Sequence, residues 1–242
     1  MALAPLPINA RESQAAESID HDCDSRGVGI VHVWVNGSWQ ARGSAYLWKT
    51  WYAGNQEQGA VFLTAKHVLT CAATGHESSV SVSLGSSTAI ASGVWSHPIK
   101  DLVVLWFRKS FVFNGKRTAT RQLYKEDWAA LKGTVARCYG YGKQHARPSP
   151  PVRSSTYLVE DVVCDTLGIP SALALRAAPD ATFLSGDSGG ACMVEAHAGQ
   201  GLTLGGIITA GGVSATEKGY ASATIISASD RGWLSRITQS MC

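Results

Sequence analysis

The chain has 242 residues, of which 45% are hydrophobic and 16% charged, and its formal net charge is +3. This length is sufficient for one large domain or for two small barrels that share an interface. The low charge and the 25 glycines favour a β-rich protein with many turns over a helical bundle. Lys and Arg are scattered, and the one basic cluster, Gly115–Arg121, indicates a solvated loop, so we expect no nucleic-acid partner.

The N-terminal half of the chain reads as strands and turns after an irregular start. Residues 1–26 lack the basic and long apolar segments of a signal peptide, and their composition predicts an N-terminal arm. Gly29–Trp48 alternates in its first half and contains Asn36-Gly37, a strong hairpin signal. Further strands are expected within 59–70, 80–95 and 100–107. The last of these includes the longest apolar run, Leu102–Phe107, which is too short to cross a bilayer, so we expect no membrane partner.

The C-terminal half repeats this pattern after a polar connector and a predicted helical turn within 124–133. Gln144–Arg153 is Pro-rich and is expected to form an exposed loop. The remaining strand candidates are 133–142, 155–164, 191–196, 202–212 and 219–226. Residues 227–239 predict a short helix with Trp233, Leu234 and Ile237 on one face. No alternation of strands with helices is present, so a parallel sheet is not expected.

Six cysteines permit a disulfide framework, but the chain is neither small nor rich in Cys, so buried free thiols fit equally well. They are Cys23, Cys71, Cys138, Cys164, Cys192 and Cys242. No two of them form a CxxC pair, so we expect no zinc cluster.

The sequence GDSGG at Gly186–Gly190 surrounds one serine with glycines. It fits the G-x-S-x-G turn of α/β-hydrolases, which requires an acid and then a histidine after the serine. The only histidine after Ser188 is His197, and no Asp lies between them, so this topology is excluded. The order His, Asp, Ser is available instead, with His67 after an apolar strand and Asp101 at the start of another.

Five segments in this order resemble the trypsin/chymotrypsin-fold serine peptidases. They are TAKH (64–67), DLVVL (101–105), GYG (140–142), GDSGG (186–190) and GIITAG (206–211). The resemblance covers roughly residues 27 to 240. It implies an all-β protein of two antiparallel six-stranded β-barrels with a short C-terminal helix. The implied divisions are a first barrel at 27–115, a connector at 116–130, and a second barrel with the helix at 131–242.

The resemblance assigns the chemistry to a triad of His67, Asp101 and Ser188. A serine hydroxyl needs a neighbouring base, and imidazole can accept its proton near neutral pH. The glycines would let the backbone amides of Gly186 and Ser188 point together at the oxyanion of the tetrahedral intermediate. The expected reaction is peptide-bond hydrolysis through an acyl-enzyme by a serine endopeptidase, with no metal and no cofactor.

Asp187 requires a cationic partner, because a buried unpaired carboxylate is costly. In zymogen-activated relatives this partner is a newly cut N-terminal amine, but the chain has no corresponding start before its first strand. Some bacterial members use an internal arginine, and the resemblance places Arg137 in that role.

The resemblance also implies a set of substrate-binding residues: Thr182, Phe183, Thr209, Ala210, Gly211 and Gly219. Thr182 is not the Asp that binds basic side chains, and Ile208 stands where Glu-specific members carry a His. Gly211 and Gly219 leave room for a large apolar side chain, unless Phe183 fills that room, so a neutral, apolar preference is expected. We expect a monomer that binds a polypeptide substrate as an added extended strand.

Several alternatives remain open from the sequence. His97 is a rival base, and Asp127 and Asp161 are rival acids. A catalytically silent peptide-binding module and an esterase with the same triad are the rival functions. The cysteine pattern differs from vertebrate digestive members, with Leu184 where a Cys is often found, and is closer to bacterial or viral ones. The location is accordingly either extracellular, after loss of a leader, or the cytosol of an infected cell.

Overall fold

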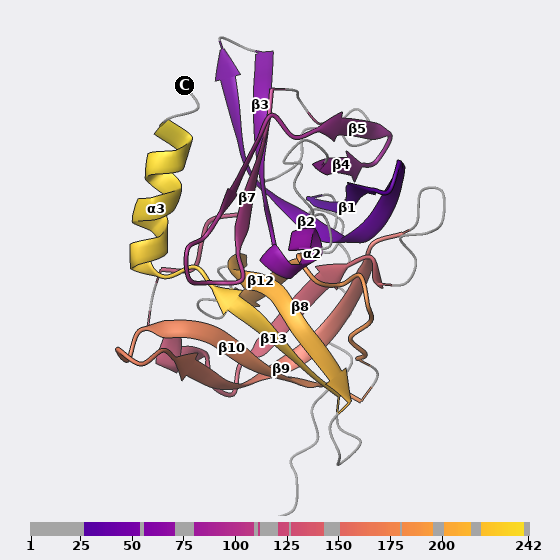
Figure 1. Ribbon diagram of the computed structural model, residues 1–242. Helices are drawn as coiled ribbons and strands as arrows, with labels where there is room; N and C mark the ends of the chain where they lie inside the picture. Colours follow the sequence, from indigo (N-terminus) through magenta and orange to yellow (C-terminus); the bar gives the residue numbers. More distant parts are fainter. Residues whose placement is uncertain are drawn as a thin grey trace, which may run out of the picture.

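The computed structural model describes residues 27–53, 56–70, 80–108, 111, 121–125, 127–142, 151–179, 181–195, 201–213 and 219–239. They form two antiparallel sheets, one above the other in Figure 1, with a helix along one flank of the upper sheet. The predicted N-terminal arm lies outside the described residues. None of the helices in the described part of the chain is both long enough and apolar enough to cross a membrane.

The first sheet contains seven strands. They are β1 (Val28–Val35), β2 (Ser38–Ala53), β3 (Gln56–Thr64), β4 (Val80–Leu84), β5 (Ser87–Ile90), β6 (Gly93–Ser96) and β7 (Val103–Phe107). Their order in the sheet is β5-β4-β1-β2-β3-β7-β6. The predicted hairpin joins β1 to β2, and Asn36 and Gly37 adopt the positive φ angles of 50° and 81° that such a turn requires. This prediction is confirmed.

The first sheet differs from the predicted six-stranded barrel because it has seven strands and an open order. Its two outer strands, β5 and β6, have only four residues each, and their side chains alternate between half-buried and exposed. Such short strands with one face toward solvent supply too little apolar surface to close the sheet against each other. The sheet therefore curves around its core without closing among the described residues.

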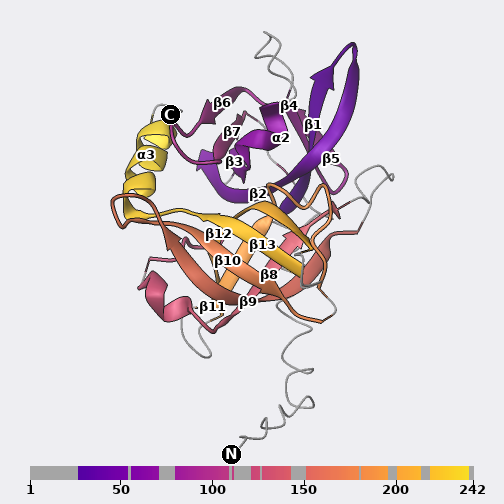
Figure 2. The same ribbon diagram turned by 60° about the horizontal axis from the view of Figure 1, so that its bottom comes forward.

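The second sheet is a closed six-stranded barrel, as predicted, with the order β10-β13-β12-β11-β8-β9. Its strands are β8 (Val135–Gly140), β9 (Arg153–Cys164), β10 (Pro170–Ala177), β11 (Ala191–Glu195), β12 (Leu202–Val213) and β13 (Gly219–Ile225). Figure 2 brings this barrel forward and shows its strands crossing obliquely beneath the first sheet. The expected helical turn between the sheets is the 3₁₀ helix η1 (Trp128–Leu131), which is capped by Asp127.

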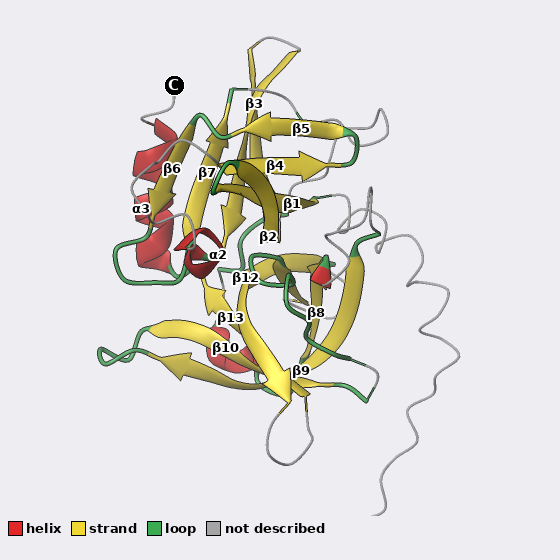
Figure 3. Ribbon diagram, turned by 45° about the vertical axis from the view of Figure 1, so that its right-hand side comes forward, coloured by secondary structure: helices red, strands yellow, loops and turns green. Residues whose placement is uncertain are grey.

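Helices are few among the described residues, as Figure 3 shows: apart from η1, this part of the chain contains α2 (Lys66–Thr70) and α3 (Ala228–Gln239). The all-β class and the terminal helix are therefore confirmed. Although α3 follows the second barrel in the chain, its buried residues Leu234 and Ile237 belong to the hydrophobic cluster that contains the core of the first sheet and the barrel residues packed against it. In Figure 1 the helix stands beside β7. The helix α3 thus connects the second barrel, which it follows in the chain, to the first sheet.

Candidate active site

His67 and Asp101 lie side by side because β3 and β7 are neighbours. The antiparallel register pairs Thr64, the last residue of β3, with Val103, the first residue of β7. His67 follows β3 at the start of α2, and Asp101 immediately precedes β7. Two segments that are distant in the sequence therefore deliver an imidazole and a carboxylate to the same edge of the first sheet.

Two hydrogen bonds join His67 to Asp101. The backbone N–H of His67 donates to Asp101 Oδ1 at 2.9 Å, and His67 Nδ1 lies 2.7 Å from Asp101 Oδ2. Burial alone would raise the pKa of Asp101, but these hydrogen bonds outweigh it and hold the pKa below its ordinary value. An ionised carboxylate only accepts hydrogen bonds, so Nδ1 carries the proton. The neutral imidazole then has its free lone pair on Nε2, as a general base requires.

Ser188 lies in the segment between β10 and β11, where the two sheets meet. Its carbonyl oxygen accepts a hydrogen bond from the N–H of Ser44 in β2 at 2.7 Å. A Cβ added to Gly43 would lie 2.7 Å from that carbonyl oxygen and 2.8 Å from Val68, the residue after His67. Ser188 is thus placed across one strand from the helix that carries His67. The described residues include no hydrogen bond between Ser188 Oγ and His67, and such bonds often tighten only when substrate is bound.

Close approach of the two sheets explains why the serine segment is rich in glycine. Gly186 and Gly189 have φ angles of 99° and 85°, which a residue with a side chain rarely adopts. A Cβ on Gly189 would also overlap the carbonyl oxygen of Ser44 and the hydroxyl of Thr64. Gly189 is therefore needed for packing against β2 and β3, a reason that the sequence interpretation did not include.

The backbone amides of this segment divide into two groups. Those of Asp187, Gly189 and Gly190 donate hydrogen bonds to the carbonyls of Leu184, Ile208 and Asp187. In the described part of the chain, the amides of Gly186 and Ser188 make no hydrogen bond. Two neighbouring unpaired donors beside a serine can bind a negatively charged oxygen.

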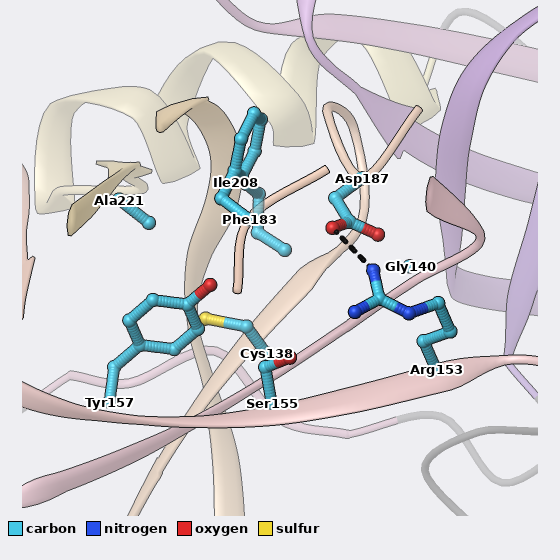
Figure 4. Close-up of a pocket in the computed structure, with 9 residues that line it drawn as sticks. All are labelled: Cys138, Gly140, Arg153, Ser155, Tyr157, Phe183, Asp187, Ile208 and Ala221. Atoms are coloured by element: carbon cyan, nitrogen blue, oxygen red, sulfur yellow. Dashed lines mark hydrogen bonds and ion pairs between the residues drawn. The ribbon is translucent and has the colours of Figure 1, made fainter. Parts of the chain in front are cut away.

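Asp187 forms an ion pair with Arg153, whereas the sequence interpretation assigned Arg137. Arg153 Nη1 lies 3.1 Å from Asp187 Oδ2, as Figure 4 shows. The reason is the alternation of side chains along β8. Gly140 faces Asp187, since an added Cβ would lie 2.7 Å from Asp187 Oδ1, and Arg153 is the cross-strand partner of Gly140. Arg137 is three residues before Gly140 and therefore points to the opposite face.

Asp187 is strongly buried, and its pKa reflects that. Burial raises the pKa above its ordinary value, although the Leu184 amide, the Arg153 charge and the Gly142 amide act in the opposite direction. The Leu184 N–H donates to Asp187 Oδ2 at 2.8 Å. The Asp187 carboxylate thus connects the turn from Leu184 to Asp187, just before Ser188, with Arg153 of β9.

His97, the rival base, belongs to a different, buried cluster of charged groups. Its Nδ1 accepts hydrogen bonds from the N–H groups of Ile99 and Lys100, so its proton is on Nε2, which lies 3.2 Å from Asp230 Oδ1. Burial lowers the pKa of His97 despite the nearby Asp230 carboxylate. Lys100 Nζ also binds Asp230, at 2.5 Å. Sequence reasoning missed this cluster because Asp230 is far away along the chain and carries no motif.

The two rival acids have other partners. Asp127 accepts a hydrogen bond from the N–H of Ala129 and caps η1. Asp161 forms an exposed ion pair with Lys132 at 3.2 Å. Only Asp101 of the three contacts His67 in the described residues.

The remaining predicted site residues lie around the start of the serine segment and on β12. Thr182 and Gly219 line a groove of about 640 Å³, whereas Phe183 lines a small internal cavity. The hydroxyl of Thr209 contacts Ser222 of β13, and Ala210 and Gly211 follow on β12. Thr182 and Gly219 therefore line the groove, Phe183 lines the adjoining cavity, and Tyr157 lines both.

Cys138, Cys164 and Cys192 are free thiols, whereas Cys23, Cys71 and Cys242 lie outside the described residues. Cys138 and Cys192 face each other across β8 and β11. Burial and the neighbouring Cys192 raise the pKa of Cys138. Among the described residues, no group of three or more His, Cys, Asp and Glu side chains is placed to hold a metal ion.

Comparison with known proteins identifies the fold. No family model and no curated protein sequence matches the chain. The solved structure of kallikrein-related peptidase 10 superposes with a TM-score of 0.62 at 16% sequence identity. The match covers 89% of this chain and 97% of that one. The chain therefore has the chymotrypsin fold, as its sequence motifs predicted.

Proposed function

We propose that the chain is a serine endopeptidase in which Ser188 is the nucleophile, His67 the general base and Asp101 the residue that orients the base. The observation that carries this proposal is the contact between His67 and an ionised Asp101, which leaves Nε2 of the imidazole free to accept a proton. The position of Ser188, across β2 from α2, is consistent with this role.

The proposed reaction proceeds in two halves. Ser188 Oγ attacks the peptide carbonyl while its proton passes to His67 Nε2, and Asp101 stabilises the resulting imidazolium. The unpaired amides of Gly186 and Ser188 bind the oxyanion. His67 then gives the proton to the leaving amine, and an acyl-enzyme remains on Ser188. Water, deprotonated by His67, attacks this ester and releases the acid product.

The substrate is proposed to bind as an extended strand along β12. The pairing of β12 with β11 ends at Ile207, and Ile208 then exchanges hydrogen bonds with Gly189 and Gly190. Beyond Ile208, β12 pairs with β13 on one side only among the described residues. A peptide can add to this free edge through backbone hydrogen bonds.

An alkyl fluorophosphonate probe tests the proposal at neutral pH. We expect one probe per chain, attached to Ser188, with no labelling of a Ser188→Ala protein and a loss of several orders of magnitude for His67→Ala. A folded protein that is not labelled would contradict the proposal and favour a silent peptide-binding module. Labelling with cleavage of esters but never of peptides would favour the esterase instead.

A further inference from the structure

Phe183 occupies the space beside the free edge of β12. A Cβ added to Gly211 would overlap Phe183 Cγ and would lie 2.6 Å from Phe183 Cβ and Cδ2. Phe183 therefore rests directly on the backbone of Gly211. Its ring also packs against the core of the second barrel, next to Ala181 and several fully buried side chains.

Little room remains behind this ring. The cavity that Phe183 lines has a volume of about 10 Å³, which is the space of roughly one water molecule. Figure 4 shows Phe183, Ile208 and Ala221 on one side of it and Cys138, Ser155 and Tyr157 on the other. A side chain of several carbon atoms cannot enter without displacing Phe183.

The path of an added peptide leads toward this cavity. Successive side chains of an extended strand point to opposite faces. The residue whose carbonyl is attacked by Ser188 can direct its side chain either to solvent or into the barrel. Phe183 covers the face of β12 at Gly211, so a substrate side chain that points toward this face meets the ring.

We propose that Phe183 is a specificity-determining residue that restricts the side chain immediately before the cleaved bond to that of glycine or alanine. This inference rests on the proposed function and narrows the neutral, apolar preference expected from the sequence. It attributes the restriction to Phe183 and not to Thr182 and Gly219, which line the adjoining groove.

The test compares two peptidyl phosphonate probes that differ only in the residue before the reactive group, alanine or phenylalanine. The parent protein is expected to react at least about 10-fold faster with the alanine probe. In Phe183→Ala that ratio is expected to reverse, because removal of the ring opens the cavity to a large side chain. The ratio for Phe183→Leu should lie between those of the parent and Phe183→Ala. This variant provides the test if Phe183→Ala does not fold.

Two controls separate the possible failures. Trp39→Ala removes a half-exposed aromatic ring from the first sheet and should keep the parent ratio. The alkyl fluorophosphonate reports the reactivity of Ser188 independently of any side-chain pocket. If the parent reacts with it and also prefers the phenylalanine probe, the assignment of Phe183 is wrong while the proposed function stands. If the parent does not react with it at all, both are overturned.

Discussion

Two buried carboxylates, Asp187 and Asp230, hold the two loops of the candidate active site, and their pKa values are shifted in opposite directions. Asp187 lies next to Ser188 and has a raised pKa, whereas Asp230 binds the residue before Asp101 and has a lowered pKa. Burial is the largest influence on both. At Asp230 it is outweighed by hydrogen bonds from Lys100 and from the hydroxyl and amide of Ser227.

The difference shows that close donors can outweigh the effect of burial on the pKa of a carboxylate. Asp187 receives the amide of Leu184 at 2.8 Å, the amide of Gly142 and the guanidinium of Arg153 at 3.1 Å, whereas Asp230 Oδ2 receives three donors within 2.7 Å. The two sites also connect different parts of the molecule. Arg153 and Asp187 both belong to the second barrel, while Lys100 and Asp230 join the first sheet to α3.

The largest effect is expected from Asp230→Ala. This change leaves the Lys100 ammonium, only 12% exposed, without its carboxylate, and it removes the acceptor of His97. Loss of one partner of a buried pair costs about 3–5 kcal/mol of unfolding free energy. Denaturant unfolding measures this cost. The fluorophosphonate labelling rate should fall by up to about 100-fold, because the turn before Asp101 loses its anchor.

Asp161→Ala is the matched control for that variant, since it removes an acid from an exposed ion pair with Lys132. Its unfolding free energy should match that of the parent, because an exposed ion pair contributes little to stability. Equal effects of the two substitutions would mean that Asp230 contributes no more than a surface charge.

A smaller effect is expected from Arg153→Ala. Asp187 keeps the hydrogen bond from the Leu184 amide when this cation is lost, so the cost should be about 2 kcal/mol, the value of a hydrogen bond to a charged group. Unfolding and labelling are measured beside Arg176→Ala, which breaks an exposed pair with Glu160. A loss larger than that of Asp230→Ala would reverse the proposed ranking of the two sites.

The smallest effect, and the sharpest contrast, is expected in the pH dependence of stability. Because the pKa of Asp187 is raised in the folded state, the protonated carboxyl contributes to stability in full at pH values below its ordinary pKa of 3.8. This contribution is lost as pH rises through the folded-state pKa. The lowered pKa of Asp230 stabilises the fold above 3.8, and this contribution is lost as pH falls through the folded-state pKa.

The variants Asp187→Asn and Asp230→Asn test these two opposite pH dependences of stability. The stability advantage of the parent over Asp187→Asn should shrink as pH rises from 3.8, whereas its advantage over Asp230→Asn should shrink as pH falls below 3.8. Thermal unfolding across this range detects both trends. Parallel trends in the two variants would refute the contrast.

Local signals predicted the fold well. The Asn36-Gly37 hairpin, the helical turn before β8 and the terminal helix each depend on neighbouring residues and turn geometry, and the structure contains all three. The openness of the first sheet was missed, because it depends on whether β5 and β6 meet at long range. Alternation of apolar residues indicates strands but not the closure of a sheet.

The site residues that stand in a sequence motif could be predicted. Interaction partners that are distant along the sequence and lie outside any motif could not. His67 and Asp101 stand in recognisable segments, and the structure brings them together. The partner of Asp187 was misassigned because it depends on the register of β8 with β9, which sequence periodicity does not supply. The role of Asp230 was missed for the same reason, since it acts on a loop more than a hundred residues earlier.

The placement of α3 on the core of the first sheet has a consequence for folding during synthesis. A growing chain emerges from its N-terminus, so the first sheet is made well before Leu234 and Ile237, which complete its core. Lys100 likewise meets Asp230 only after the whole second barrel has been made. A nascent chain that stops short of α3 therefore contains all three candidate catalytic residues while the loop before Asp101 still lacks its anchor.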